Sequence, residues 1–308
     1  MKKFFALILA ALFFMTPAQA QTTYTVDNEE SATELTGVPT EKLYASLPKA
    51  KGDYKSRVRP ILIEGAMNTE TEILVRALKN PVAYHEMNYL FVAGTYKNYP
   101  VVIVRTEQGL ANAAASTALA IKKFNPVAVI NQGTAGGTTP ALKIGDIVIG
   151  EKIIPSSAFK SDYSPKGAGV DFTAQEMRGT YAFDAAIKTF QPHSEYLSDP
   201  TLFNVAFAVA NAHENFNAVS GTIGTADWWM SWVDYMDMLN KRYGMVCEEM
   251  ETVAAAQICH NANVPFIGIR VISDNITVSD EYLPESATIT QNFVLLVVEK
   301  YIRDILKA

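Results

Sequence analysis

The segment that most constrains the fold is a short, wholly apolar strand pattern at residues 126–130, which follows an Ala-rich helical pattern at residues 109–124. A strand without polar positions must be covered on both faces, as in a sheet that lies between two layers of helices. Further strand patterns at residues 60–63 and 264–272 alternate with helical ones. The alternation predicts one α/β domain around a central sheet, spanning residues 57–308.

The other expected elements follow from hydrophobic periodicity and turn residues. A hairpin is expected where two strand patterns, residues 89–95 and 101–105, are separated by a short link. Residues 155–198 are rich in Ser, Gly, Pro and aromatics and predict long loops with one short helix near residues 183–190. Asp199 before a proline predicts a capped helix start. The remaining strands are expected at residues 146–150, 219–224 and 245–249, and the remaining helices at 69–78, 199–214, 251–263 and 288–306.

The first twenty residues have the pattern of a cleaved export signal. Two lysines precede an apolar stretch at residues 4–15, and a small-x-small site ends at Ala20. A membrane anchor is the alternative, but the apolar stretch is shorter than the ~20 residues that span a bilayer. We therefore expect cleavage after Ala20, export to a bacterial periplasm and no stable membrane anchor. Residues 21–56 are expected to form an N-terminal arm.

Composition excludes several classes of partner. The net charge of −6 argues against a nucleic-acid groove. The four histidines lack metal-ligand spacing, and the glycines at residues 133–137 do not have the spacing of a dinucleotide fingerprint. We expect no metal, no cofactor and a small-molecule ligand. Cys247 and Cys259 could pair in an exported protein, but an expected helix separates them, so two buried thiols are predicted.

Acidic residues follow two expected strands. Glu249 and Glu251 stand where a strand turns into a helix, and Asp274 ends the strand pattern at residues 264–272. Ligands of open α/β sheets bind at the carboxyl ends of the strands, so the two clusters should converge on one pocket. Such acids suit recognition of sugar hydroxyls and proton delivery to a leaving group. A plain helix cap at Asp274 and two surface acids remain the alternatives.

Other polar and aromatic patterns are less specific. The glycines at residues 133–137 could form a tight turn, or let the backbone approach a ligand after the buried strand. Trp228 and Trp229 follow Asp227 at the end of an expected strand. They are either core residues or a surface on which a planar base stacks.

Together these motifs resemble the purine nucleoside phosphorylase and nucleosidase superfamily, and within it are most similar to the 5′-methylthioadenosine/S-adenosylhomocysteine nucleosidases. The resemblance covers about residue 60 to the C-terminus, but is weak over residues 155–245 except at Asp227 and Trp229. Five blocks carry it, at residues 65–70, 131–137, 142–148, 249–251 and 264–274. It implies a three-layer α/β/α sandwich around a mixed sheet, usually a homodimer, which needs no cofactor and hydrolyses the N-glycosidic bond to release adenine.

The resemblance also implies a role for each matching residue. Asp274 would be the general acid that protonates N7 of adenine, with Ser273 orienting it. Glu70 would be the base that activates water, and Glu251 would accept hydrogen bonds from the ribose hydroxyls. The other residues implied in substrate binding are Ala66, Thr134, Gly136, Trp229, Glu249, Met250, Arg270 and Tyr282.

Several of these residues have a more specific implied place. Met250 would pack against the sugar and Trp229 against adenine, with Glu249 supporting the site. Thr134 stands where the family usually has Ser and keeps its hydroxyl. Arg270 would lie near the water and the base that activates it.

The sequence departs from the family in its export signal and at residues 156–175, which replace the loop that helps form the pocket for the 5′-substituent. Specificity on that side is therefore left open, and Tyr282 is expected to close the pocket. One alternative is a phosphate-dependent phosphorylase, although Glu70 in the first glycine loop would repel phosphate. The other is a secreted, non-catalytic nucleoside-binding or storage protein, against which the retention of both Glu70 and Asp274 argues.

Overall fold

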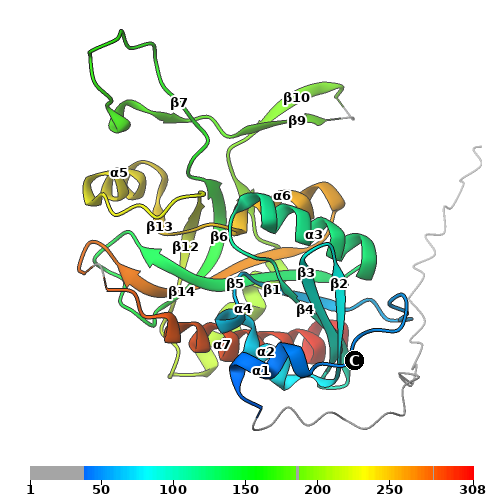
Figure 1. The fold of residues 1–308 in the computed structure, drawn as a ribbon. Coiled ribbons are helices and arrows are strands. Elements are labelled where there is room, and N and C mark those ends of the chain that lie inside the picture. The colour runs from blue at the N-terminus through cyan, green and yellow to red at the C-terminus, as the bar shows by residue number, and fades with distance from the viewer. Residues whose placement is uncertain (1–37, 185–186, 280) are drawn as a thin grey trace, which may run out of the picture. The chain divides into compact units, whose positions relative to one another are not determined.

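The computed structural model describes residues 38–184, 187–279 and 281–308, which belong to one compact unit (Figure 1). The expected export signal and the first part of the expected arm lie outside these residues. Within the described part of the arm, Thr40–Leu43 forms the short helix α1, and Leu43 and Leu47 are buried in the core of the domain.

The main sheet has ten strands among the described residues, in the order β11-β6-β12-β13-β5-β1-β4-β3-β2, and β14 pairs with both β5 and β6. Parallel and antiparallel pairs are mixed. The strands are β1 (Ile61–Gly65), β2 (Lys79–Glu86), β3 (Tyr89–Tyr96), β4 (Tyr99–Arg105), β5 (Ala128–Gly137), β6 (Ile147–Pro155), β11 (Tyr196–Leu197), β12 (Ala218–Thr225), β13 (Met245–Glu249) and β14 (Phe266–Asn275).

Alternating side chains of the central strands enter two different cores, as expected for a sheet that is covered on both faces. Ile61, Ile63 and Ile130 belong to one buried cluster, whereas Leu62 and Val129 belong to the other. The first core packs against α2 (Asn68–Ala77), α4 (Pro200–Ala212) and α7 (Ala287–Tyr301), and the second against α3 (Leu110–Phe124) and α6 (Thr252–Ala262).

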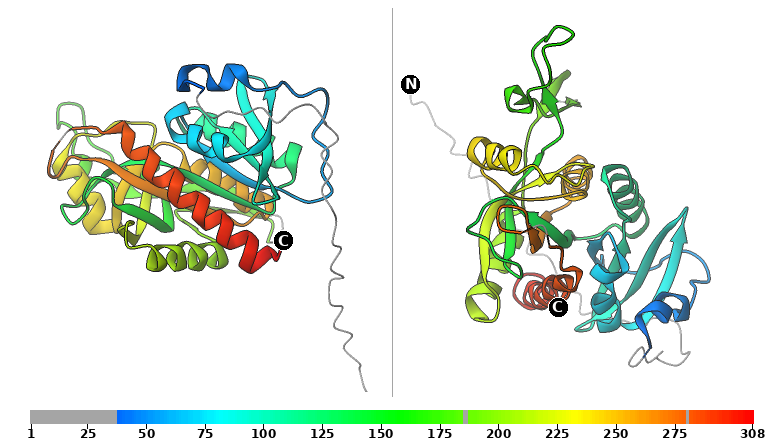
Figure 2. Two further views of the ribbon diagram at one scale, coloured as in Figure 1. Left: turned by 90° about the horizontal axis from the view of Figure 1, so that it is seen from below. Right: turned by 60° about the vertical axis from the view of Figure 1, so that its left-hand side comes forward.

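The helices therefore form two layers with the sheet between them, which confirms the predicted α/β/α sandwich (Figure 1). α4 and α7 run side by side on one face (Figure 2), and α3 packs on α6 on the other. A further helix, α5 (Val233–Tyr243), packs against β13, and the chain closes with the π-helical turn η4 (Ile302–Leu306). No helix in the described residues is both long and apolar enough to cross a membrane.

Local sequence signals account for much of this structure. All eight strands and all the long helices expected from the sequence are present, with shifted ends. The predicted cap at Asp199 is confirmed, because its carboxylate accepts hydrogen bonds from two backbone N–H groups of the first turn of α4. The predicted β3–β4 hairpin is also confirmed. Cys247 and Cys259 are free and buried, as predicted.

The segment between β6 and β11 differs from the prediction. It contains two small sheets outside the main one, formed by β7 (Phe159–Lys160) with β8 (Glu176–Met177), and by β9 (Thr180–Asp184) with β10 (Thr189–His193). The short helix predicted near residues 183–190 is wrong. Phe183 and Phe190 instead pair across the antiparallel β9 and β10, where their rings contact each other. Cross-strand pairing of this kind stabilises a hairpin and is invisible to helical periodicity.

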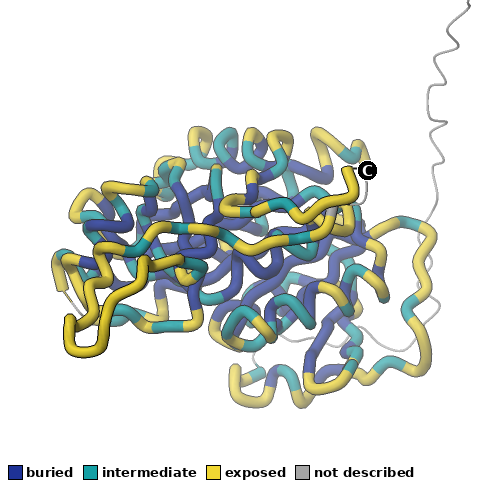
Figure 3. The backbone as a smooth tube through the Cα atoms, turned by 90° about the horizontal axis from the view of Figure 1, so that it is seen from above, coloured by how far each residue is buried: buried dark blue, intermediate teal, exposed yellow. Residues whose placement is uncertain are grey.

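The longer elements β2 and α5, like the short α1 and β11, were also not expected from the sequence. β2 starts with exposed polar positions and has no clear apolar pattern. α5 carries charged residues between its buried ones, which are Tyr235, Met236, Met238 and Leu239. The alternative of a tight turn at residues 133–137 is also wrong, because β5 continues through these glycines to Gly137. Buried strands occupy the middle of the domain, and the exposed chain lies around them (Figure 3).

Candidate active site

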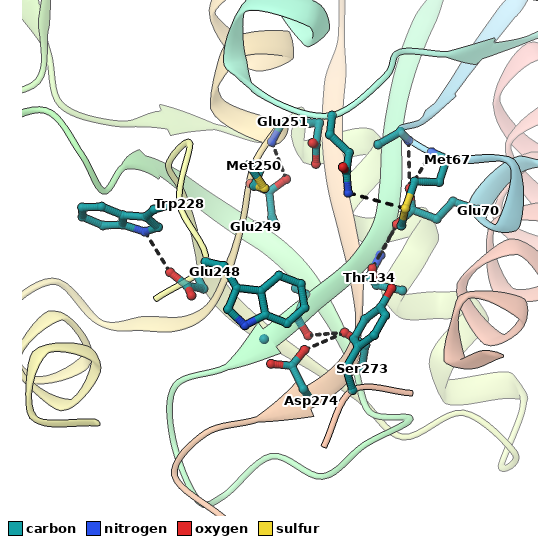
Figure 4. A pocket seen from close by; sticks show the side chains of 16 residues that line it. Met67, Glu70, Thr134, Trp228, Glu248, Glu249, Met250, Glu251, Ser273 and Asp274 are labelled. Carbon is teal, nitrogen blue, oxygen red and sulfur yellow. Dashed lines mark hydrogen bonds between the residues drawn. The ribbon is translucent and has the colours of Figure 1, made fainter. Parts of the chain in front are cut away.

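The ends of β1, β5, β13 and β14 and the loops that follow them surround one pocket (Figure 4). The convergence predicted for the two acidic clusters is therefore confirmed. Of the twelve residues expected at the site, only Arg270 does not line this pocket. The lining residues are Ala66, Met67, Glu70, Gln108, Thr134, Ala135, Gly136, Trp228, Trp229, Glu248, Glu249, Met250, Glu251, Ser273, Asp274 and Tyr282.

Glu70 lies in the first turn of α2 and is 3% exposed. One oxygen, Oε2, accepts hydrogen bonds from the backbone N–H groups of Ala66 and Met67 at 2.9 and 3.1 Å. The other, Oε1, accepts from the backbone N–H and the hydroxyl of Thr134 at 2.8 and 3.0 Å. Gly133 leaves the space that this carboxylate occupies, since a Cβ there would lie 2.6 Å from Oε1. Four donors hold the carboxylate in one place at the pocket wall.

Asp274 stands near the end of β14 and is 7% exposed. Its Oδ1 accepts a hydrogen bond from the Ser273 hydroxyl at 2.9 Å, and that hydroxyl also lies 3.2 Å from the carbonyl oxygen of Ala135. Burial raises the pKa of Asp274 above its ordinary value, and the hydrogen bond from Ser273 opposes the rise. Gly136 makes room for Asp274, because a Cβ there would lie 3.0 Å from Oδ2. A carboxyl group in this position retains a proton more readily than one in water.

Glu249 and Glu251 are both buried, which excludes the alternative of two surface acids. They do not share one extended segment, because β13 ends at Glu249 and Glu251 precedes the first residue of α6. Glu249 Oε2 accepts from the backbone N–H groups of Glu251 and Thr252, each at 2.9 Å. Glu251 Oε1 accepts from the N–H of Gly109 at 2.8 Å, at the start of α3. Burial, followed by the charges of Glu249 and Glu70, raises the pKa of Glu251 to about 8.

Arg270 lies behind the pocket and is 1% exposed. Its guanidinium pairs with Glu249 at 2.6 Å and donates to the side-chain oxygen of Asn131, whose amide donates to the buried Glu64. Burial opposes ionisation of Glu249, but the Arg270 charge and several hydrogen bonds outweigh it and lower the pKa of Glu249. Arg270 was expected near the water and Glu70. Burial opposes ionisation of Arg270, but the charges of neighbouring carboxylates, that of Glu70 among them, outweigh it and raise the pKa of Arg270. Arg270 does not, however, line the pocket. Its contacts are those of a residue that holds Glu249 in place.

Aromatic and apolar side chains cover the polar wall. Trp229 is 65% exposed, and its ring contacts that of Tyr282 edge to face at 5.4 Å. Tyr282 lines the pocket together with Thr134, whose hydroxyl donates to Glu70. Met250 lines the pocket between the acids of β13 and α6. Trp229 is therefore a pocket residue and not part of the core.

Glu248 is the acidic pocket residue that the sequence reasoning missed, and Met67, Gln108, Ala135 and Trp228 also line the pocket without being among the expected site residues. Trp228 Nε1 donates to Glu248 Oε2 at 3.0 Å, and the Met230 N–H lies 3.3 Å from Glu248 Oε1. Burial, opposed by these hydrogen bonds and assisted by the charge of Asp274, raises the pKa of Glu248 to about 7. The sequence feature that could have identified Glu248 is its position next to Glu249 at the end of a strand. A strand pattern alone, however, does not show which of two adjacent acids reaches a pocket.

The pocket thus combines a fixed carboxylate, a carboxyl group with a raised pKa and a third acid between two helix starts. It is suited to acid–base chemistry on a polyhydroxylated ligand with a planar group. Among the described residues, no group of three or more His, Cys, Asp or Glu side chains is arranged to hold a metal ion.

Comparisons with known proteins agree with this geometry. The family model of the phosphorylase superfamily matches residues 60–303. The 5′-methylthioadenosine/S-adenosylhomocysteine nucleosidase of Anoxybacillus flavithermus is 30% identical over 247 residues, which cover 78% of this chain and 98% of the relative.

Solved structures of such enzymes are also similar to this chain. The Neisseria meningitidis nucleosidase in complex with methylthio-immucillin-A is 28% identical, with a TM-score of 0.64, over 79% of this chain and 99% of that one. The Colwellia psychrerythraea nucleosidase in complex with adenine is also 28% identical, with a TM-score of 0.64, over 81% and 97% of the two chains. The chain therefore belongs to the phosphorylase superfamily and, within it, to the 5′-methylthioadenosine/S-adenosylhomocysteine nucleosidase family.

Proposed function

We propose that the protein hydrolyses the N-glycosidic bond of 5′-methylthioadenosine, S-adenosylhomocysteine or both, and releases adenine. The observation that carries the proposal is the set of three acids, Glu70, Glu251 and Asp274, in different environments around one pocket. Acids held by different partners can take the separate roles of proton donor and proton acceptor.

Asp274 is proposed as the proton donor. Adenine leaves readily only when its ring is protonated, so a carboxyl group with a raised pKa, as at Asp274, suits delivery of a proton to N7. The C1′–N9 bond then breaks, its electron pair stays with the base, and positive charge develops on the ribose ring. Ser273 orients the Asp274 carboxyl through its hydrogen bond.

Glu70 is proposed as the acceptor of the proton from water. As the water oxygen bonds to C1′, its proton passes to the Glu70 carboxylate, which four donors hold in position. The developing positive charge on the ribose is stabilised by the carboxylates nearby. Glu251 has one oxygen bonded to Gly109 and the other available to ribose hydroxyls. Met250 and Trp229 supply apolar contacts to the sugar and the base.

The composition of the pocket favours hydrolysis over phosphorolysis. Phosphate needs an anion site, but none of the described residues that line the pocket is Lys, Arg or His. The buried guanidinium of Arg270 is already paired with Glu249. The Glu70 carboxylate would repel phosphate and accept a hydrogen bond from water instead.

The test is adenine release from 5′-methylthioadenosine, S-adenosylhomocysteine and adenosine, measured by chromatography with and without phosphate. Equal release in both conditions is the expected result, and the three rates would rank the 5′-substituents. Release that requires phosphate would make the protein a phosphorylase and remove the role of Glu70. Binding of nucleoside without any release would favour a non-catalytic binding protein. Asp274→Asn is the matched control for contaminating activity.

We also propose that the protein is exported to the periplasm with cleavage after Ala20, and that it forms a homodimer. Export rests on the signal pattern of residues 1–20, and the dimer rests on the family resemblance. N-terminal sequencing of protein from a periplasmic fraction should begin at Gln21. Light scattering of the mature protein should give twice the mass of one chain. An uncleaved chain in the cytoplasm, or a monomeric mass, would overturn the respective proposal.

A further inference from the structure

Glu248 and Asp274 occupy matched positions on either side of one residue. Gly136 of β5 pairs with Glu248 of β13 on one side and with Asp274 of β14 on the other. Neighbouring strands are about 4.8 Å apart, so the two acidic residues have Cα atoms roughly 10 Å apart across the sheet. Paired residues project from the same face of a sheet. Gly136 has no side chain, and the Asp274 carboxyl group lies over it, where a Cβ would be 3.0 Å from Oδ2. All three residues line the pocket.

The Glu248 carboxylate is anchored but not saturated. It accepts one hydrogen bond at each oxygen, from Trp228 Nε1 and from the Met230 N–H. An ionised carboxylate has about four acceptor sites, so about two remain for a ligand. Nothing in the proposed reaction uses this group, although it is largely buried and lies in the electrostatic field of Asp274.

One edge of adenine is complementary to a pair of carboxyl groups of which one is protonated and the other ionised. In adenine, the acceptor N7 and the donor 6-amino group lie next to each other on one edge, whereas a 6-oxopurine presents two acceptors there. The proposed reaction requires Asp274 at N7. The group that lies beside N7 on the purine is the 6-substituent, and the acid that lies beside Asp274 across Gly136 is Glu248.

We propose that Glu248 is a specificity-determining residue of the base subsite, whose carboxylate accepts a hydrogen bond from the 6-amino group and thereby selects 6-aminopurines over 6-oxopurines. This inference rests on the proposed function, since it takes the orientation of the base from proton delivery to N7. With a 6-oxopurine, the oxo oxygen would lie against the Glu248 carboxylate. Both groups are hydrogen-bond acceptors, so neither would have a donor.

The bound base also determines where the proton of the pair resides. Two neighbouring carboxyl groups titrate as a pair, and burial makes double ionisation costly. The lone pair on N7 stabilises a protonated Asp274, and the N–H of the 6-amino group stabilises an ionised Glu248. A 6-aminopurine therefore favours the arrangement that the reaction needs, with the proton on Asp274.

The experiment compares kcat/KM for 5′-methylthioadenosine and its 6-oxo counterpart, 5′-methylthioinosine, in the wild type, Glu248→Gln and a control variant. The amide introduced by Glu248→Gln would still accept from an amino group but can also donate to an oxo group. The ratio between the two substrates should therefore fall about 10- to 100-fold, the range of a hydrogen bond to a charged group. The control is Glu214→Gln, at an exposed position, which should keep the wild-type ratio. An unchanged ratio in folded Glu248→Gln would overturn the proposal.

Binding of the free bases provides a readout that does not depend on turnover. Calorimetry should show that the wild type prefers adenine to hypoxanthine, and that Glu248→Gln reduces this preference by a similar factor. If the wild type releases no base from either nucleoside, the proposed function fails, and the ratio of adenine to hypoxanthine affinities alone decides the role of Glu248. Equal affinity ratios in the wild type and Glu248→Gln would then reject it.

Discussion

Replacement of Gly133 by alanine would displace the Glu70 carboxylate without removing it. An added Cβ would lie 2.6 Å from Glu70 Oε1 and 3.0 Å from its Cδ. Ordinary contact begins at 3.4 Å, so Oε1 must retreat by the difference, about 0.8 Å. Gly133 does not have a positive φ, so the backbone itself accepts alanine. The effect of the substitution should therefore act through Glu70.

The size of the effect follows from the hydrogen bonds that Oε1 accepts. They have lengths of 2.8 and 3.0 Å, both from Thr134. A retreat of about 0.8 Å along either bond would break it, and hydrogen bonds to charged groups contribute about 1.5–3 kcal/mol each. A misplacement of about 1 Å in a reacting group costs about 100-fold in rate. We expect Gly133→Ala to lower kcat about 100-fold while the protein remains folded.

The assay is steady-state adenine release by Gly133→Ala, Glu70→Ala and the double variant, with thermal unfolding as the control for folding. In the Glu70→Ala background the new Cβ has no carboxylate to displace, so the second substitution should change kcat little. Wild-type kcat in folded Gly133→Ala would refute the steric reasoning. An equal loss in both backgrounds would show that the alanine acts on something other than Glu70.

Three further outcomes are expected. Asp274→Asn should lower kcat about 100- to 10,000-fold with unchanged thermal unfolding, and unchanged turnover would remove Asp274 as the acid. Burial raises the pKa of Glu64 from 4.5 to about 7, so the wild type should lose about 3 kcal/mol of stability relative to Glu64→Gln as the pH rises from 4.5 through 7. A difference in Tm between the two proteins that stays constant from pH 5 to pH 8 would contradict this. Trp229→Ala should raise KM about 10-fold through lost stacking, with a smaller change in kcat, and an unchanged KM would place the base elsewhere.

Local patterns predicted most of the fold because they report local physics. Uninterrupted apolar strands require cover on both faces, and Asp199 before Pro200 has the chemistry of a helix start. The prediction failed at residues 183–190, where the pairing of Phe183 with Phe190 depends on a partner strand and not on local periodicity. It also missed α5, although Tyr235, Met236, Met238 and Leu239 form a buried face on this helix.

The sequence alone therefore determined the α/β/α architecture and, through family resemblance, the acids Glu70, Glu251 and Asp274. Only the tertiary structure decided which neighbours surround them. It leaves Arg270, an expected site residue, outside the pocket lining and brings Glu248, which was not expected there, into it. The reason is that strand register joins segments that are far apart in sequence. Gly136 lies between Glu248 and Asp274 only because three strands align, and no local pattern encodes that alignment.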